Sequence, residues 1–159
     1  MQDKTQLIVG NTAPNITLLN QKGETFDLYQ ILDSGQKVLL VFYPADDTPG
    51  CTTQLCGIRD IYGEYTKAGV TIVGVNSGDA RQHQKFIDKH SYPFDILVDK
   101  LEDGTKRGVA IEYGAIGAFM GHTTTKRGVF LIDTDKTIIY QVWGQQNNQE
   151  ILDFLKTEK

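Results

Sequence analysis

Residues 38–60, VLLVFYPADDTPGCTTQLCGIRD, decide the fold that this sequence predicts. The apolar run 38–43 is rich in β-branched and aromatic residues and predicts a buried strand. Pro44 ends that strand, and turn-forming residues then lead to a helical pattern that begins at Cys51. Unpaired backbone N–H groups and the positive end of the helix dipole favour a thiolate at such a position. We therefore expect Cys51 to be a nucleophile at a strand-to-helix junction.

The second of the two cysteines, Cys56, lies five positions after Cys51. On a continuous α-helix this step turns by about 140° and separates the two Cα atoms by roughly 8–9 Å. A disulfide requires Cα atoms closer than about 7 Å. The pair therefore either stays reduced or forms a disulfide only when the first turns of this helix unwind. The catalytic motif of thioredoxins, which has two residues between its cysteines, is a different pattern.

The pattern Pro44-x-x-x-Thr48-x-x-Cys51 resembles the active-site signature of the peroxiredoxins, which are thiol peroxidases with a thioredoxin-like fold. The longer string TPGCTTQLCGIRD resembles the peroxiredoxin Q branch, also called bacterioferritin comigratory protein. The resemblance continues through GNTAPNITLLNQKGETFDL, KAGVTIVGVN and YGAIGAFMGHTTTKRGVFLID. In the last of these segments Arg127 stands just before a late strand, where peroxiredoxins carry an active-site arginine.

The resemblance implies an antioxidant peroxidase that reduces hydrogen peroxide and alkyl hydroperoxides with electrons from thioredoxin or a similar thiol reductant. Cys51 would attack the peroxide and become a sulfenic acid, which Cys56 would resolve as an intramolecular disulfide. Thr48 and Arg127 would stabilise the leaving oxygen, and Pro44 would shield the thiolate from water. The residues expected to contact the substrate are Pro44, Thr48, Gly50, Cys51 and Arg127.

Several residues outside the catalytic signature also have expected roles. We expect Gln54, one turn after Cys51, to hold Arg127 in place, and Arg59 to pair with a nearby carboxylate. Phe119 and Met120 are expected to pack beside the active site. We expect no metal and no cofactor, because two cysteines supply only two soft ligands and the histidines lack metal-ligand spacing. These histidines, expected at the surface or in the core, are His83, His90 and His122.

Two other functions remain open for the same residues. The first is a thiol–disulfide oxidoreductase acting on protein substrates, although the four-residue gap and the Pro, Thr and Arg set argue against it. The second is a redox-sensing, partner-binding protein in which the helix melts on oxidation and exposes a binding surface.

The remaining hydrophobic pattern predicts alternating strands and helices. We expect a hairpin at 15–28 that turns at 22–23 and packs over one end of the domain, and a helix from 51 to about 67. A strand at 70–75, a helix at 79–90 and a strand at 93–98 should follow, and then one helical turn and a loop at 109–119. The chain should end with paired strands at 128–133 and 137–143 and a helix at 149–156. This order predicts an α/β protein. Together with the resemblance, it implies a thioredoxin-like fold with a central mixed β-sheet flanked by helices and an N-terminal β-hairpin extension.

Length and composition limit the class of protein. With 159 residues, 40% hydrophobic and 23% charged, the sequence predicts one domain over residues 1–159. The net charge of −4 with no basic block argues against nucleic-acid binding. No signal peptide or long apolar run is visible, so we expect no membrane contact and a cytoplasmic location. The resemblance also favours a monomer over a dimer.

Overall fold

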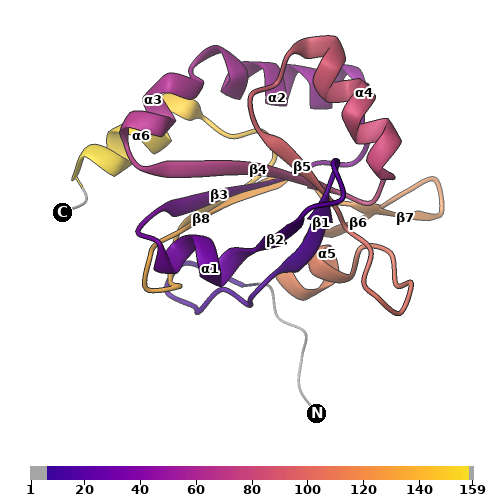
Figure 1. Cartoon of the computed structure of the whole chain (residues 1–159), viewed down its shortest axis with the longest axis horizontal. Helices are drawn as coiled ribbons and strands as arrows, with labels where there is room; N and C mark the ends of the chain where they lie inside the picture. Colours follow the sequence, from indigo (N-terminus) through magenta and orange to yellow (C-terminus); the bar gives the residue numbers. More distant parts are fainter. Residues whose placement is uncertain (1–6, 158–159) are drawn as a thin grey trace.

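The computed structural model describes residues 7–157, except for the side chain of Phe119, and it contains a seven-stranded mixed sheet with helices on both faces (Figure 1). The elements are β1 (Thr17–Asn20), β2 (Thr25–Asp27), α1 (Leu28–Asp33), β3 (Lys37–Phe42), α2 (Pro49–Asp60), α3 (Tyr62–Lys67), β4 (Val70–Asn76), α4 (Ala80–His90), β5 (Asp95–Val98), α5 (Gly108–Tyr113), β6 (Ile116–Phe119), β7 (His122–Thr125), β8 (Gly128–Ile132), β9 (Ile138–Trp143) and α6 (Asn148–Thr157). The strand order is β2-β1-β5-β4-β3-β8-β9.

The apolar run after Lys37 forms β3, which lies inside the sheet between β4 and β8. It pairs in parallel with β4 and antiparallel with β8, so the sheet is mixed, as the sequence predicted. Successive side chains of a strand point to opposite faces, and β3 accordingly supplies two cores. Leu39 and Val41 pack under α2, α3, α4 and α6, whereas Leu40 and Phe42 pack with α1 and α5.

The fold class predicted from the sequence is confirmed, and the N-terminal hairpin differs in its role. β1 pairs with β5 as well as with β2, so the hairpin extends the central sheet instead of packing over one end. The chain then turns directly into α1, because Asp27 accepts the Gln30 N–H as an N-cap and stops the strand one residue earlier than expected.

The helix expected from 51 to 67 is two helices. α2 begins two residues earlier, at Pro49, which fits the first position of a helix because its ring fixes φ and it lacks an N–H. Ile61 leaves the helical region with φ −122° and ψ 22°, and α3 starts after it. The bend brings Tyr65 into the core, where its hydroxyl donates to Asn148 Oδ1 over 2.8 Å.

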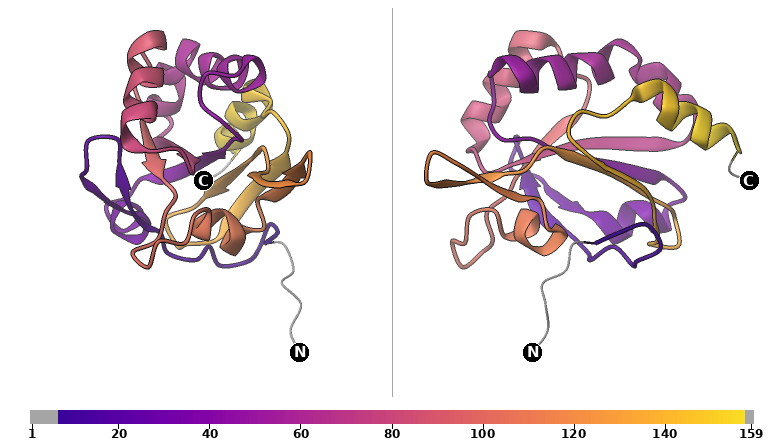
Figure 2. Two further views of the ribbon diagram at one scale, coloured as in Figure 1. Left: turned by 90° about the vertical axis from the view of Figure 1, so that its right-hand side faces the viewer. Right: turned by 180° about the vertical axis from the view of Figure 1, so that it is seen from behind.

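The loop expected after residue 113 is a β-hairpin. β6 and β7 pair antiparallel around a turn in which Met120 and Gly121 both have positive φ, as a type I′ hairpin turn requires. Methionine is an unusual residue at such a position, so the turn was not visible in the sequence. The hairpin projects from the body of the molecule (Figure 2, right). No helix within residues 7–157 is long and apolar enough to span a bilayer.

Candidate active site

Cys51 lies in the first turn of α2, and its side chain is fully buried. The Arg127 guanidinium donates from Nη2 to the Cys51 Sγ over 3.3 Å. Arg127 stands just before β8, and β8 pairs with β3, which leads into the loop before α2. The sheet therefore brings together two residues that are 76 positions apart in the sequence. A helix N-terminus and a guanidinium therefore both lie beside the Cys51 sulfur.

Gln54 occupies the position that the sequence suggested. Its side chain is fully buried, and its Oε1 accepts from Arg127 Nη1 over 2.7 Å. The backbone of Arg127 is also fixed, because its carbonyl accepts the Gly144 N–H over 2.8 Å. The guanidinium therefore contacts Cys51 and Gln54 at once with two of its nitrogens, which a planar fork can do and a lysine ammonium cannot.

Pro44 and Thr48 flank the loop between β3 and α2. Thr48 is the N-cap residue of α2, and its hydroxyl donates to the Ala45 carbonyl over 3.1 Å instead of capping the helix. Its own carbonyl accepts the Thr52 N–H over 2.8 Å. The loop thus turns back on itself beside the cysteine.

A cavity of about 550 Å³ opens beside Cys51. Four of the predicted residues line it, namely Pro44, Thr48, Cys51 and Arg127. The rest of the lining comes from the loop and from the β6–β7 segment, with Ala45, Gly117, Ala118, Thr124, Thr125 and Lys126. Such a site, with a thiol and a cation at one wall, can activate a thiolate and stabilise charge on a leaving oxygen.

Two residues that the sequence placed at the site, Gly50 and Met120, do not line the cavity. Gly50 lies outside the cavity lining, but a Cβ placed on it would come within 3.0 Å of Arg127 Nη2. Met120 is 80% exposed at the hairpin turn, so the prediction that it packs beside the site is wrong. The Phe119 side chain, named with it, lies outside the described part of the chain.

Cys56 is partly buried five residues further along the same unbroken helix. Its Sγ lies 3.4 Å from the hydroxyl of Tyr92, and both cysteines carry free thiols. Burial raises the pKa of Tyr92, which keeps this hydroxyl protonated. Tyr92 also stacks on Phe94, with ring centroids 5.2 Å apart. Sequence reasoning missed Tyr92, because nothing in the sequence connects it to Cys56 across 36 positions.

The remaining polar predictions are located as follows. Arg59 pairs with Asp60 over 2.9 Å and also donates to the His90 carbonyl over 2.8 Å. His122 is exposed, His90 is partly buried, and His83 is fully buried against Asp46. Within residues 7–157, no three His, Cys, Asp or Glu side chains cluster closely enough to hold a metal ion.

The chain is similar to known proteins over most of its length. The AhpC/TSA family profile matches residues 9–141. A Coxiella burnetii protein described as a peroxiredoxin bcp is 39% identical over 138 residues, which cover 85% of this chain and 87% of that protein. The chloroplastic peroxiredoxin Q of Triticum aestivum is 38% identical over 141 residues, or 89% of this chain. This chain spans only about three fifths (61%) of the wheat protein's length.

Among solved structures, the peroxidoxin BcpB of Mycobacterium tuberculosis superposes with a TM-score of 0.83 at 28% identity. The match covers 95% of this chain and 97% of that one. A Xylella fastidiosa PrxQ mutant has the same fold, with a TM-score of 0.82.

Proposed function

The chain belongs to the AhpC/TSA family and is a thiol-dependent peroxidase, and we propose that Cys51 is the residue that attacks the peroxide. The observation that carries this assignment is the 3.3 Å contact between the Arg127 guanidinium and Cys51 Sγ at the start of α2. The relatives are peroxiredoxins, and they do not favour the disulfide-exchange or redox-sensor alternatives.

The first step would be attack of the Cys51 thiolate on one oxygen of the peroxide. A sulfur–oxygen bond forms and the oxygen–oxygen bond breaks, so the sulfur becomes a sulfenic acid and the other oxygen leaves as an alkoxide or hydroxide. Arg127 and the N–H groups of the first turn of α2 are placed to stabilise this negative charge, and Thr48 lines the same cavity. The leaving oxygen takes a proton and departs as an alcohol or water.

The second step would be attack of the Cys56 thiol on the sulfenic acid, which releases water and forms a disulfide. Both cysteines lie in the unbroken α2, and the five-residue step keeps their Cα atoms beyond disulfide range. The first turns of α2 must therefore unwind, and Cys56 must leave Tyr92. A dithiol reductant of the thioredoxin type would then exchange with this disulfide.

The substrates would be hydrogen peroxide and alkyl hydroperoxides. The cavity is lined mainly by apolar atoms and side chains such as Pro44, Ala45 and Ala118, which suits an alkyl group.

We also propose that the protein is a monomer and that it is located in the cytoplasm. The first is tested by sedimentation velocity and the second by cell fractionation.

A coupled assay tests the proposal. Purified protein is supplied with NADPH, thioredoxin reductase and thioredoxin, and NADPH oxidation is followed after addition of hydrogen peroxide or cumene hydroperoxide. Wild type should turn over both peroxides, and Cys51→Ser should lose all turnover. An insulin-reduction assay without peroxide should show no activity. Peroxide turnover that survives in Cys51→Ser would rule out the assignment.

A further inference from the structure

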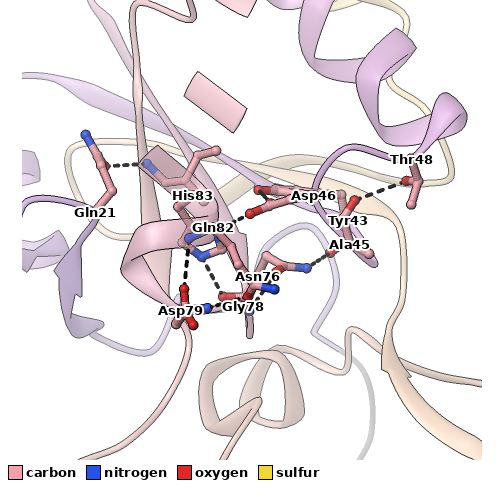
Figure 3. Close-up of polar contacts among 11 residues, drawn as sticks. Gln21, Tyr43, Ala45, Asp46, Thr48, Asn76, Gly78, Asp79, Gln82 and His83 are labelled. Atoms are coloured by element: carbon pink, nitrogen blue, oxygen red, sulfur yellow. Dashed lines mark hydrogen bonds and ion pairs between the residues drawn. The ribbon is translucent and has the colours of Figure 1, made fainter. Parts of the chain in front are cut away.

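A buried polar cluster joins the 44–48 loop to β4 and α4 (Figure 3). The His83 side chain on α4 is fully buried, and the Asp46 carboxylate in the loop is 10% exposed. His83 Nδ1 lies 2.6 Å from Asp46 Oδ2, and its Nε2 lies 3.3 Å from the Asn76 carbonyl. A carboxylate at this depth is costly unless it is paired, so the loop conformation and the His83 contact depend on each other.

Asp46 is held on its second oxygen as well. The Tyr43 hydroxyl donates to Asp46 Oδ1 over 2.5 Å, and Asn76 Nδ2 donates to the Tyr43 carbonyl over 2.8 Å. Burial and the nearby Asp46 charge raise the pKa of Tyr43, so its hydroxyl remains a donor. Asn76 Oδ1 in turn accepts the Gly78 N–H over 2.7 Å. Polar networks in which both oxygens of a carboxylate are bonded give a segment a single conformation.

The loop that this cluster holds carries three residues of the cavity, Pro44, Ala45 and Thr48. Asp46 stands between Pro44 and Thr48, both of which line the cavity beside Cys51. Thr48 is linked back through its hydroxyl to the Ala45 carbonyl, next to Asp46. Asp47 is held with a positive φ of 59°, which costs energy unless its neighbours fix it.

His83 does not line the cavity in which the peroxide would react. Asp46 is also absent from the described residues that line the cavity beside Cys51. The contacts of His83 go to Asp46 and to the Asn76 backbone. Any effect of His83 on peroxide reduction must therefore pass through the loop.

We propose that His83 is a positioning residue for peroxide reduction. By binding the Asp46 carboxylate, it holds the 44–48 loop, and with it Pro44 and Thr48, over the Cys51 thiolate. The inference rests on the proposed role of Cys51 and extends it to a residue outside the cavity.

Two substitutions of His83 separate its two contacts. His83→Asn places an amide N–H where Nδ1 stands and keeps the donor to Asp46, whereas His83→Gln places the amide near Nε2 and loses that donor. Both are made with Cys56→Ser, so that Cys51 is the only thiol. Lys89→Met is the matched control, because Lys89 pairs with Asp47 over 2.9 Å from the same helix to the same loop, but in an exposed pair.

Two rates are compared for each variant: the second-order reaction with hydrogen peroxide, and alkylation of Cys51 by iodoacetamide, which needs no peroxide-binding groups. We expect His83→Gln to slow the peroxide reaction by about tenfold or more, and His83→Asn and Lys89→Met by less than about threefold. Alkylation should change by less than about threefold in all of them. Asp46→Ala should slow the peroxide reaction and spare alkylation in the same way as His83→Gln. If His83→Gln does not fold, Asp46→Ala tests the proposal in its place.

The outcomes separate this inference from the proposed function. A slow peroxide reaction in the Cys56→Ser parent contradicts the role of Cys51. A fast parent with unchanged His83→Gln and Asp46→Ala rates overturns only the role of His83. An equal fall of both rates also overturns it, because that result would show general disruption of the fold instead of a loss of peroxide positioning.

Discussion

The Arg127 guanidinium fills the space above Gly50, and this close approach is open to a direct test. Gly50 is the second residue of α2, and Gly63 is the second residue of α3. A Cβ at Gly50 would lie 3.0 Å from Arg127 Nη2, whereas a Cβ at Gly63 would meet nothing within 4 Å. The two glycines therefore form a matched pair that differs in contact with the active site.

We predict that Gly50→Ala slows the peroxide reaction by about tenfold, or about 1.4 kcal/mol, because the methyl group displaces the guanidinium from Cys51. Gly63→Ala should leave that rate unchanged. Both should unfold at an equal or slightly higher denaturant concentration, because alanine favours helix over glycine by up to about 1 kcal/mol. Stopped-flow mixing with peroxide and urea unfolding measure the two quantities. Equal peroxide rates for the two variants would show that the Arg127 position is not sensitive to this contact.

At this scale the sequence predicted the residues that lie close together in the chain. Pro44, Thr48 and Cys51 occupy one short stretch, and their spacing carries the resemblance to the peroxiredoxin signature. Arg127 was reached only through the family resemblance. Tyr92 beside Cys56 and His83 beside Asp46 could not be predicted, because these contacts join residues 36 and 37 positions apart through the packing of α4 and β5 against α2 and the loop.

The helix α2 has two incompatible requirements in the proposed cycle. It must be folded for Arg127 and the helix N-terminus to act on Cys51, and partly unfolded for Cys56 to reach it. We predict that oxidation by one equivalent of peroxide speeds amide hydrogen exchange over residues 49–56, while exchange in β3 and β4 stays unchanged. Cys56→Ser should show no such change after the same treatment. Unaltered protection over 49–56 in a disulfide-bonded wild type would contradict the unwinding.

A second link between elements depends on a single buried carboxylate. Asp99, just after β5, accepts the N–H groups of Val109 and Ala110 over 2.9 Å each and so anchors the start of α5. Removing it leaves two buried donors without a partner, at about 1–3 kcal/mol each. We predict that Asp99→Ala lowers the free energy of unfolding by about 2–6 kcal/mol, and Asp99→Asn by about half as much. Asp103→Asn, at an exposed carboxylate, is the control.

The Asp99 link also has a predicted pH dependence. Burial raises the pKa of Asp99 above its ordinary value of 3.8, so the folded state favours the protonated acid. As the pH rises from 3.8, the unfolded chain ionises first, and the folded state loses stability relative to it. The stability advantage of wild type over Asp99→Asn should therefore shrink with rising pH. Urea unfolding at several pH values measures it, and a growing advantage would contradict the assigned direction.

Elements with a clear hydrophobic period were predicted, and those with a mixed signal were not. β3, β4, β8 and β9 were within one or two residues of their predicted bounds. The β6–β7 hairpin was missed because its glycine, alanine and threonine residues resemble a loop, and because its turn places Met120 at positive φ. Its pairing comes from the backbone and not from a buried stripe of side chains.

At the scale of the whole molecule, the two cores share the same strands. β3 contributes side chains to both cores. Loss of the helices from either face would therefore expose core side chains of a strand on which the other core also depends. The prediction that residues 1–159 form one domain follows this logic. We expect urea unfolding followed by Trp143 fluorescence and by far-UV circular dichroism to give one coincident transition. Two separated transitions would indicate more than one folding unit.

The central claim is that Cys51 attacks peroxide and Cys56 resolves the product. Its most direct test is stopped-flow mixing of reduced wild type and Cys56→Ser with one equivalent of hydrogen peroxide, followed by intact mass measurement. The account predicts a second-order rate constant within roughly 10⁴–10⁸ M⁻¹s⁻¹. Wild type should lose the mass of two hydrogens, and Cys56→Ser should gain one oxygen on Cys51. A rate no faster than that of the urea-unfolded chain, or an oxygen found on Cys56 of wild type, would contradict the account.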